Sequence, residues 1–120
     1  MPKFTQTNSI GTGESYVRVP RAEVLRLNNT HITPEIAELF LLANMIPCQV
    51  EFSSRDTKRR WGTAFARSKR VILYRHTVWT FLHEVAHTIA DVAEHHGPQF
   101  GQILDALYLK WKVVETNGKT

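Results

Sequence analysis

Two histidines and a glutamate in the second half of the chain have the spacing of a metal site. His83, Glu84 and His87 form the pattern HExxH. On an α-helix, residues at positions i and i+4 project from the same face one turn apart, so both imidazoles can reach one ion. Zinc accepts such ligands, and the adjacent carboxylate can act as general base toward a zinc-activated water. The spacing therefore predicts Zn2+ as the cofactor, His83 and His87 as ligands and Glu84 as the catalytic residue.

The residues around this motif favour a zinc site over its alternative, a surface helix whose histidines stack by coincidence. A helix that is apolar on most of its circumference is buried. Buried polar side chains need partners, and a metal ion is a partner that satisfies two histidines and a glutamate together. The apolar neighbours are Val78, Trp79, Phe81, Leu82, Val85, Ala86, Ile89 and Ala90.

A catalytic zinc site needs a third protein ligand. Gly97-Pro98 predicts a break followed by a new helix, and the turn before it can bring a ligand back to the metal. His96 is the first candidate and His95 the second, followed by the acids Asp91 and Glu94. Asp91 lies one turn beyond the motif, which suits a residue that orients a ligand better than a ligand itself. The spacing HExxH-x8-H is also longer than the metzincin pattern.

The segments HEVAH at 83–87 and HGPQF at 96–100 resemble the SprT-like zinc metallopeptidases and their small phage and actinobacterial relatives. Those proteins pair HExxH on one helix with HGxxF or HGxxW at the start of the next. They also tend to have a Gly-x-Ala strand and a strand of alternating aliphatics before the motif helix, which here are residues 62–65 and 71–74. The resemblance extends from about Ile32 to Trp111.

This resemblance implies a minimal zincin-like domain with peptidase activity. It implies a catalytic role for Glu84 and three metal ligands, His83, His87 and His96. Larger members often carry a cysteine-rich zinc ribbon for nucleic acid, whereas Cys48 is the single cysteine of this chain. The DNA-directed functions of those members are therefore not implied here. The expected substrate is a protein or peptide.

Periodicity and turn signals predict one α+β domain over residues 16–114, with flexible tails at 1–15 and 115–120. We expect a small antiparallel three-stranded sheet covered on one face by helices, with the motif helix followed by a second helix. The expected strands are residues 49–53, 61–66 and 70–74, with a further short one at 16–19. The expected helices are residues 21–27, one that begins at Pro34, 77–93 and 98–113.

Two of these elements carry more specific expectations. The helix that begins at Pro34 is predicted to turn Ile36, Leu39, Phe40 and Ala43 inward. Strand 61–66 is predicted to lie at the edge of the sheet near the metal, where an extended substrate can add to it as a further strand. Trp61, at the start of this strand, is expected in the core.

Positive charge is concentrated in one part of the chain, whose formal net charge is +4. Between Arg55 and Arg75 there are eight Lys or Arg residues against one acid, Asp56. Solvated loops that discourage edge-to-edge strand pairing explain such a cluster. The alternative is a rim that binds nucleic acid or an acidic substrate. A basic nucleic-acid-binding protein with a structural or vestigial metal site is therefore the second functional hypothesis.

The remaining composition predicts a cytoplasmic protein without a membrane partner. The chain has no signal-like start and no apolar run of transmembrane length. One cysteine cannot form an intramolecular disulfide.

Overall fold

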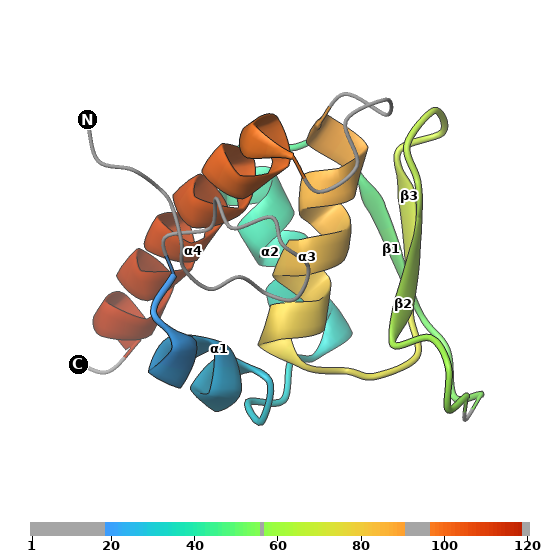
Figure 1. The fold of residues 1–120 in the computed structure, drawn as a ribbon, viewed down its shortest axis with the longest axis horizontal. Coiled ribbons are helices and arrows are strands. Elements are labelled where there is room, and N and C mark those ends of the chain that lie inside the picture. Colours follow the sequence, from blue (N-terminus) through green and yellow to red (C-terminus); the bar gives the residue numbers. More distant parts are fainter. Residues whose placement is uncertain (1–18, 56, 91–96, 119–120) are drawn as a thin grey trace.

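The computed structural model describes residues 19–55, 57–90 and 97–118, which form a small α+β domain (Figure 1). A sheet lies along one side, and the helices pack on one of its faces. The helices are α1 (Arg21–Leu27), α2 (Pro34–Ala43), α3 (Val78–Ile89) and α4 (Pro98–Gly118). The strands are β1 (Gln49–Phe52), β2 (Gly62–Phe65) and β3 (Arg70–Leu73). The strand expected at 16–19 lies outside the described residues except for Val19, which is not in a strand.

The sheet is mixed, with the strand order β1-β3-β2, so the prediction of an antiparallel sheet is wrong. Strand β3 is antiparallel to β2 and parallel to β1. Residues 53–61 join β1 to β2 across the end of β3, because Phe52 and Gly62 both pair with Leu73. This link is too long for a tight hairpin, which leaves room for β3 in the centre. The central strand, β3, is also the most apolar one, and its residues Val71 and Leu73 are fully buried.

Helix α3 lies between the sheet and α4 (Figure 1). The Thr77 side chain caps its start by accepting a hydrogen bond from the Thr80 backbone N–H at 3.3 Å. The helix ends at Ile89, and Ala90 is already extended. The helix expected at 77–93 therefore corresponds to α3 from Val78 to Ile89. Of its expected last residues, 91–93 lie outside the described ranges.

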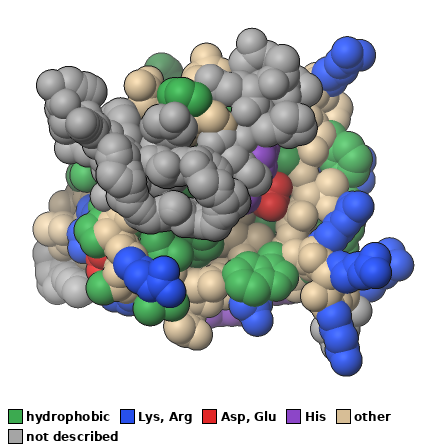
Figure 2. Space-filling model, viewed as in Figure 1, with side chains coloured by type: hydrophobic (Ala, Val, Ile, Leu, Met, Phe, Trp, Pro, Cys, Tyr) green, Lys and Arg blue, Asp and Glu red, His purple; other side chains and the backbone are tan. Residues whose placement is uncertain are grey.

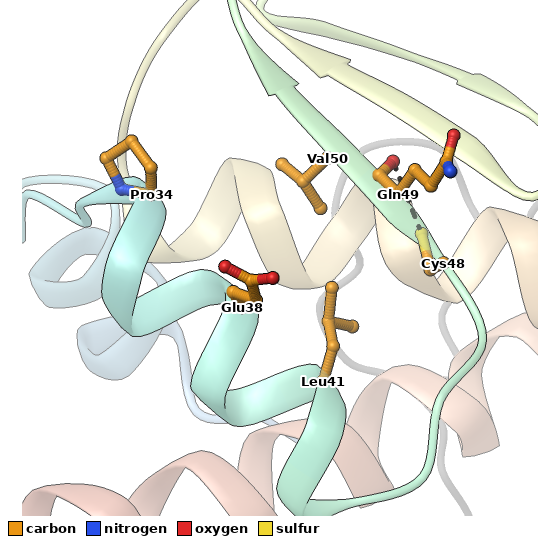
Figure 3. Close-up of a pocket in the computed structure, with 6 residues that line it drawn as sticks. All are labelled: Pro34, Glu38, Leu41, Cys48, Gln49 and Val50. Carbon is orange, nitrogen blue, oxygen red and sulfur yellow. Dashed lines mark hydrogen bonds between the residues drawn. The ribbon is translucent and has the colours of Figure 1, made fainter.

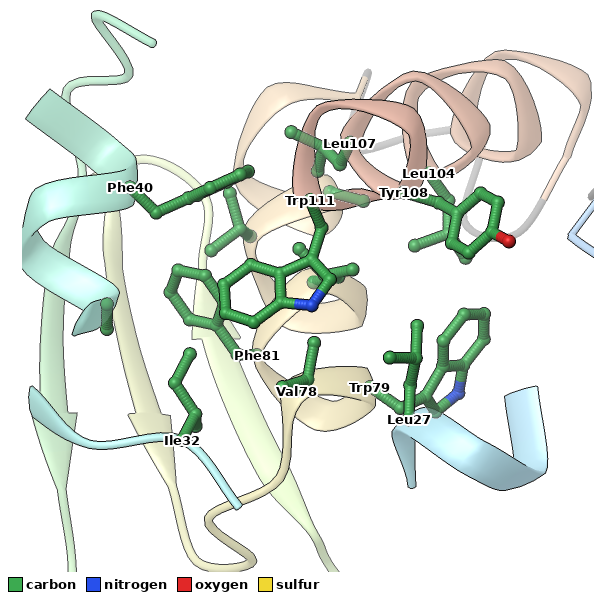
Figure 4. Close-up of a cluster of buried hydrophobic side chains, with 14 of the residues drawn as sticks. Leu27, Ile32, Phe40, Val78, Trp79, Phe81, Leu104, Leu107, Tyr108 and Trp111 are labelled. Atoms are coloured by element: carbon green, nitrogen blue, oxygen red, sulfur yellow. The ribbon is translucent and has the colours of Figure 1, made fainter. Parts of the chain in front are cut away.

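Helix α4 closes the core on the side of α3 away from the sheet (Figure 4). The Phe40 ring lies 5.7 Å from the Phe81 ring and 5.6 Å from the Trp111 ring, so α2, α3 and α4 meet in one aromatic cluster. The helix continues past residue 113, where we expected its end, to Gly118. Its buried face consists of Phe100, Leu104, Leu107, Tyr108 and Trp111, and Ile103 is partly buried beside them.

Helix α2 begins as predicted but faces the core differently. Thr33 caps it, and its hydroxyl accepts a hydrogen bond from the Ile36 backbone N–H at 3.3 Å. Of the residues expected to face inward, Phe40 is buried, whereas Ile36 is 42% and Leu39 65% exposed and Ala43 is also exposed. Ala37 and Leu41 complete the buried face. The run of apolar residues from 39 to 43 covers more than half of the helix circumference, so periodicity alone does not select the face that packs. No helix within the described ranges is long and apolar enough to cross a membrane.

A charged network joins α1 to α4. The Glu23 carboxylate accepts hydrogen bonds from the Arg26 guanidinium at 2.8 and 2.9 Å, from the Tyr108 hydroxyl at 2.8 Å and from the Lys112 ammonium at 3.4 Å. The hydrogen bonds from Arg26 are the largest cause that lowers the pKa of Glu23 to about 2. Glu115 extends the network by pairing with Arg26 at 2.8 Å.

The lowered pKa of Glu23 predicts a pH dependence of stability. A carboxyl whose pKa is lower in the folded state adds stability above its unfolded pKa, near 4.5, and loses it as the pH falls toward the folded value. We expect the free energy of unfolding to decrease from pH 4.5 to about 2, and to decrease less steeply in Glu23→Gln. Urea denaturation followed by circular dichroism measures this difference. The exposed Glu38→Gln change is the matched control, and an unchanged slope in Glu23→Gln would contradict the prediction.

Candidate metal centre and active site

The two motif histidines lie side by side on consecutive turns of α3. Their ring centroids are 5.0 Å apart and the ring planes are tilted by 72°. Both side chains are half-buried. Phe100 from the first turn of α4 packs against both rings, at 5.1 Å from His83 and 4.5 Å from His87. The start of α4 therefore lies directly against the pair of imidazoles.

Glu84 points toward the sheet into a small pocket. The pocket has a volume of about 190 Å³ and includes His83 and Trp79 in its lining, together with Trp61 and Thr80. Burial raises the pKa of Glu84 to about 7. Figure 2 shows a histidine surface next to an acidic surface near the centre of this face, with Lys and Arg side chains along the border on the side of the sheet.

Strand β2 approaches α3 so closely that a Cβ atom on Gly62 would collide with Glu84 unless that side chain moved. A Cβ atom on Gly62 would lie 2.7 Å from Cγ of Glu84 and 3.1 Å from Cγ2 of Thr80. The side chain of Glu84 is therefore held between its own helix and the backbone of β2. Sequence reasoning missed this role of Gly62, since a glycine in a strand signals a close backbone approach without naming the partner.

The donor chemistry of α3 fits zinc, but only two of the three expected protein ligands lie in the described part of the chain. Two adjacent imidazoles are suitable zinc ligands. Within residues 19–55, 57–90 and 97–118, no group of three or more His, Cys, Asp or Glu side chains could hold a metal. The predicted third ligand His96 and the alternatives His95, Asp91 and Glu94 all lie outside these ranges.

A pocket between α2 and β1 offers less chemistry (Figure 3). It has a volume of about 270 Å³, and Cys48 and Glu38 are its groups with metal-binding or nucleophilic potential. The Cys48 thiol donates to the Gln49 carbonyl at 3.8 Å. Burial raises the pKa of this thiol, which disfavours the thiolate form that reacts as a nucleophile.

The structure divides the basic cluster between Arg55 and Arg75 into two groups. The link 53–61 and Arg75 lie at one end of β2 and β3, and the turn 66–69 lies at the other. Four residues of strand, about 13 Å, separate the ends. Lys69 in the distant group donates to the Thr88 carbonyl, and Arg70 pairs with Glu51 at 3.2 Å. The cluster is therefore not one continuous rim.

Trp61 lies at the surface rather than in the core, where we expected it. Its side chain is 43% exposed, and the Arg75 guanidinium stacks over its ring at 4.1 Å. The rings of His31 and His76 also lie near each other, 6.3 Å apart, outside the pocket that contains Glu84.

Comparison with known proteins identifies no relative of this chain. No protein-family model, curated protein or solved structure matches it.

The close approach at Gly62 predicts an energetic coupling to Glu84. We expect Gly62→Ala to lower the free energy of unfolding by about 1–3 kcal/mol, because the added methyl group overpacks the site. In the Glu84→Ala background the cost should shrink, since the Cγ atom that the methyl group meets is absent. Urea denaturation of the four proteins with a chelator present measures the coupling. Costs that simply add would show that the methyl group does not meet Glu84.

Proposed function

We propose that this protein is a zinc-dependent metallopeptidase. The observation that carries the proposal is the arrangement on α3. Two imidazoles lie 5.0 Å apart, and the intervening glutamate is half-buried in a pocket beneath a sheet-edge strand. A structural histidine pair would not need a carboxylate beside it in an open pocket. Hydrolytic zinc sites combine these features.

His83 and His87 are two of the proposed ligands, and His96 is the third. Phe100 supports a ligand from the segment just before α4, because it places the first turn of this helix against both imidazoles. His96 precedes Phe100 by only four residues in the sequence, which makes it the preferred candidate. His95 remains the second candidate.

The chain's own residues supply the proton transfers and the position of the substrate. When bound, zinc acts as a Lewis acid that activates water and polarises a peptide carbonyl. Glu84 accepts the proton of the attacking water and delivers a proton to the leaving amine. The close contact with Gly62 holds the Glu84 side chain in place for both transfers.

Strand β2 is the proposed binding edge for an extended substrate. It is an edge strand, and the Trp61 carbonyl accepts a hydrogen bond from the Tyr74 N–H at 2.9 Å. Because antiparallel strands alternate their hydrogen-bonded pairs, the backbone groups of Gly62 and Ala64 point away from β3. A peptide that pairs with these groups passes beside Glu84.

The metal content of single variants tests the ligand set. We expect one zinc per chain by elemental analysis in the wild type and in Glu84→Gln, and loss of zinc in His83→Ala and His87→Ala, because two ligands do not hold the ion tightly. His96→Ala should also lose zinc, whereas His95→Ala should retain it. His31→Ala is the matched control, since its ring lies outside the pocket. Zinc retained in both His83→Ala and His87→Ala would contradict the site.

Cleavage by Glu84→Gln tests the reaction. We expect zinc-loaded wild type to generate new amino termini in a proteome-derived peptide library, as detected by mass spectrometry. Glu84→Gln should be slower by at least about a hundredfold, because it cannot accept the proton. Equal cleavage by the two proteins would refute the role of Glu84.

A further inference from the structure

A basic pocket adjoins the pocket that contains Glu84. It has a volume of about 440 Å³ and is lined by Thr57, Lys58, Arg60, Trp61, Tyr74 and Arg75. Trp61 lines both pockets, so this residue forms a wall that they share. Three cationic side chains thus surround one concave surface next to the proposed reaction site.

The position of this pocket is tied to the binding edge. The Trp61 carbonyl accepts hydrogen bonds from the N–H groups of both Tyr74 and Arg75, each at 2.9 Å. Arg75 is also stacked on the Trp61 ring at 4.1 Å. These contacts join Trp61, the residue just before β2, to the residues that follow the end of β3. The pocket is therefore fixed at this end of the two strands. A peptide along the edge of β2 therefore reaches the pocket within one to three residues of Glu84.

The cations of this pocket are available to a ligand. In the part of the chain that the structure describes, no carboxylate pairs with Lys58, Arg60 or Arg75. Other basic residues of the domain do have such partners, as Arg26 has Glu23 and Glu115, and Arg70 has Glu51. Carboxylates form charge-assisted hydrogen bonds with guanidinium groups, which are stronger than neutral ones.

We propose that this pocket is a specificity site for an acidic side chain of the peptide substrate, an aspartate or glutamate one to three residues from the scissile bond. The proposal rests on the proposed peptidase function. The proposed substrate class is peptides with Asp or Glu near the scissile bond, which would be preferred over peptides with Asn or Gln at the same position. Lys58 and Arg60 bind the carboxylate, and Arg75 adds charge while it holds the Trp61 wall.

The geometry favours an acidic peptide over a nucleic acid. Arg75 covers one face of the Trp61 ring, and that face is then closed to a stacking base. Nucleic-acid grooves also follow the phosphate backbone with a continuous track of charge. Here the basic cluster is divided, and Lys69 and Arg70 at its distant end are occupied by contacts within the protein.

Binding to the inactive Glu84→Gln protein tests the proposal without relying on cleavage. A library of decapeptides randomised at every position is incubated with the zinc-loaded variant, and the bound pool is sequenced by mass spectrometry. We expect the bound peptides to be enriched in Asp or Glu relative to the input. The most enriched peptide is then compared with its own Glu→Gln copy by fluorescence anisotropy. The copy should bind about tenfold more weakly, which corresponds to about 1.4 kcal/mol.

Matched charge variants locate the effect. Arg60→Gln and Lys58→Gln are each introduced into the Glu84→Gln protein. Each change should abolish the preference for the acidic peptide over its Gln copy. Arg67→Gln removes the same charge from an exposed residue at the distant end of the hairpin and should keep that preference. Exposed residues are changed in all three proteins, so the fold is not at risk.

Three results would overturn the proposal. The first is a bound pool with no enrichment in acidic residues. The second is an equal loss of the preference in Arg67→Gln, which would show an effect of net charge alone. The third is a fluorescein-labelled oligothymidine that displaces the peptide and binds through Arg60 more tightly than any peptide. Zinc content and Glu84-dependent cleavage are measured separately from peptide binding. If the protein bound acidic peptides selectively but held no zinc and cleaved no peptide, the peptidase proposal would be refuted and the binding pocket would stand.

Discussion

Helix α3 is packed from two sides, and this constraint determines where its polar residues can lie. The sheet covers one side and α4 the other, so Phe81, Leu82, Val85 and Ala86 are fully buried. His83, Glu84 and His87 occupy the remaining strip between these two contacts. Half-buried imidazoles and a half-buried carboxylate carry a desolvation cost, which a bound metal would offset. The packing of α3 between the sheet and α4 therefore places the three polar residues where the proposed metal would bind.

Under the proposed function, the edge strand and the basic pocket would form a path for a substrate next to this strip of polar residues. Glu84 is held against the backbone of β2 at Gly62, and the basic pocket begins at the neighbouring Trp61. A peptide that pairs with β2 would therefore present a backbone carbonyl to the site and a nearby side chain to the cations. In this proposal, Gly62 of β2 would serve catalysis by leaving room for Glu84, and the neighbouring Trp61 would serve selectivity.

Sequence patterns predicted the helices better than the sheet. The motif helix and the start of α4 at Pro98 follow from helical periodicity and from the Gly97-Pro98 break. The strand order depends on residues 53–61, which are long enough either to join β1 and β2 as neighbours or to pass the end of a strand between them. The residue pattern within each strand does not distinguish these two arrangements, so it could not place β3 in the centre. The face of α2 was mistaken because its apolar residues surround the helix. The contact between Gly62 and Glu84 joins residues 22 positions apart, and no local pattern reveals it.

Anomalous diffraction at the zinc edge, from crystals of the zinc-loaded protein, tests the central claim most directly. We expect one peak per chain within about 2.0–2.1 Å of a ring nitrogen of His83 and of His87. Its third protein ligand should come from the segment before Pro98, and the Glu84 carboxylate should lie next to the open coordination position. A peak at the His31 and His76 rings instead, or none in the presence of excess zinc, would contradict the account.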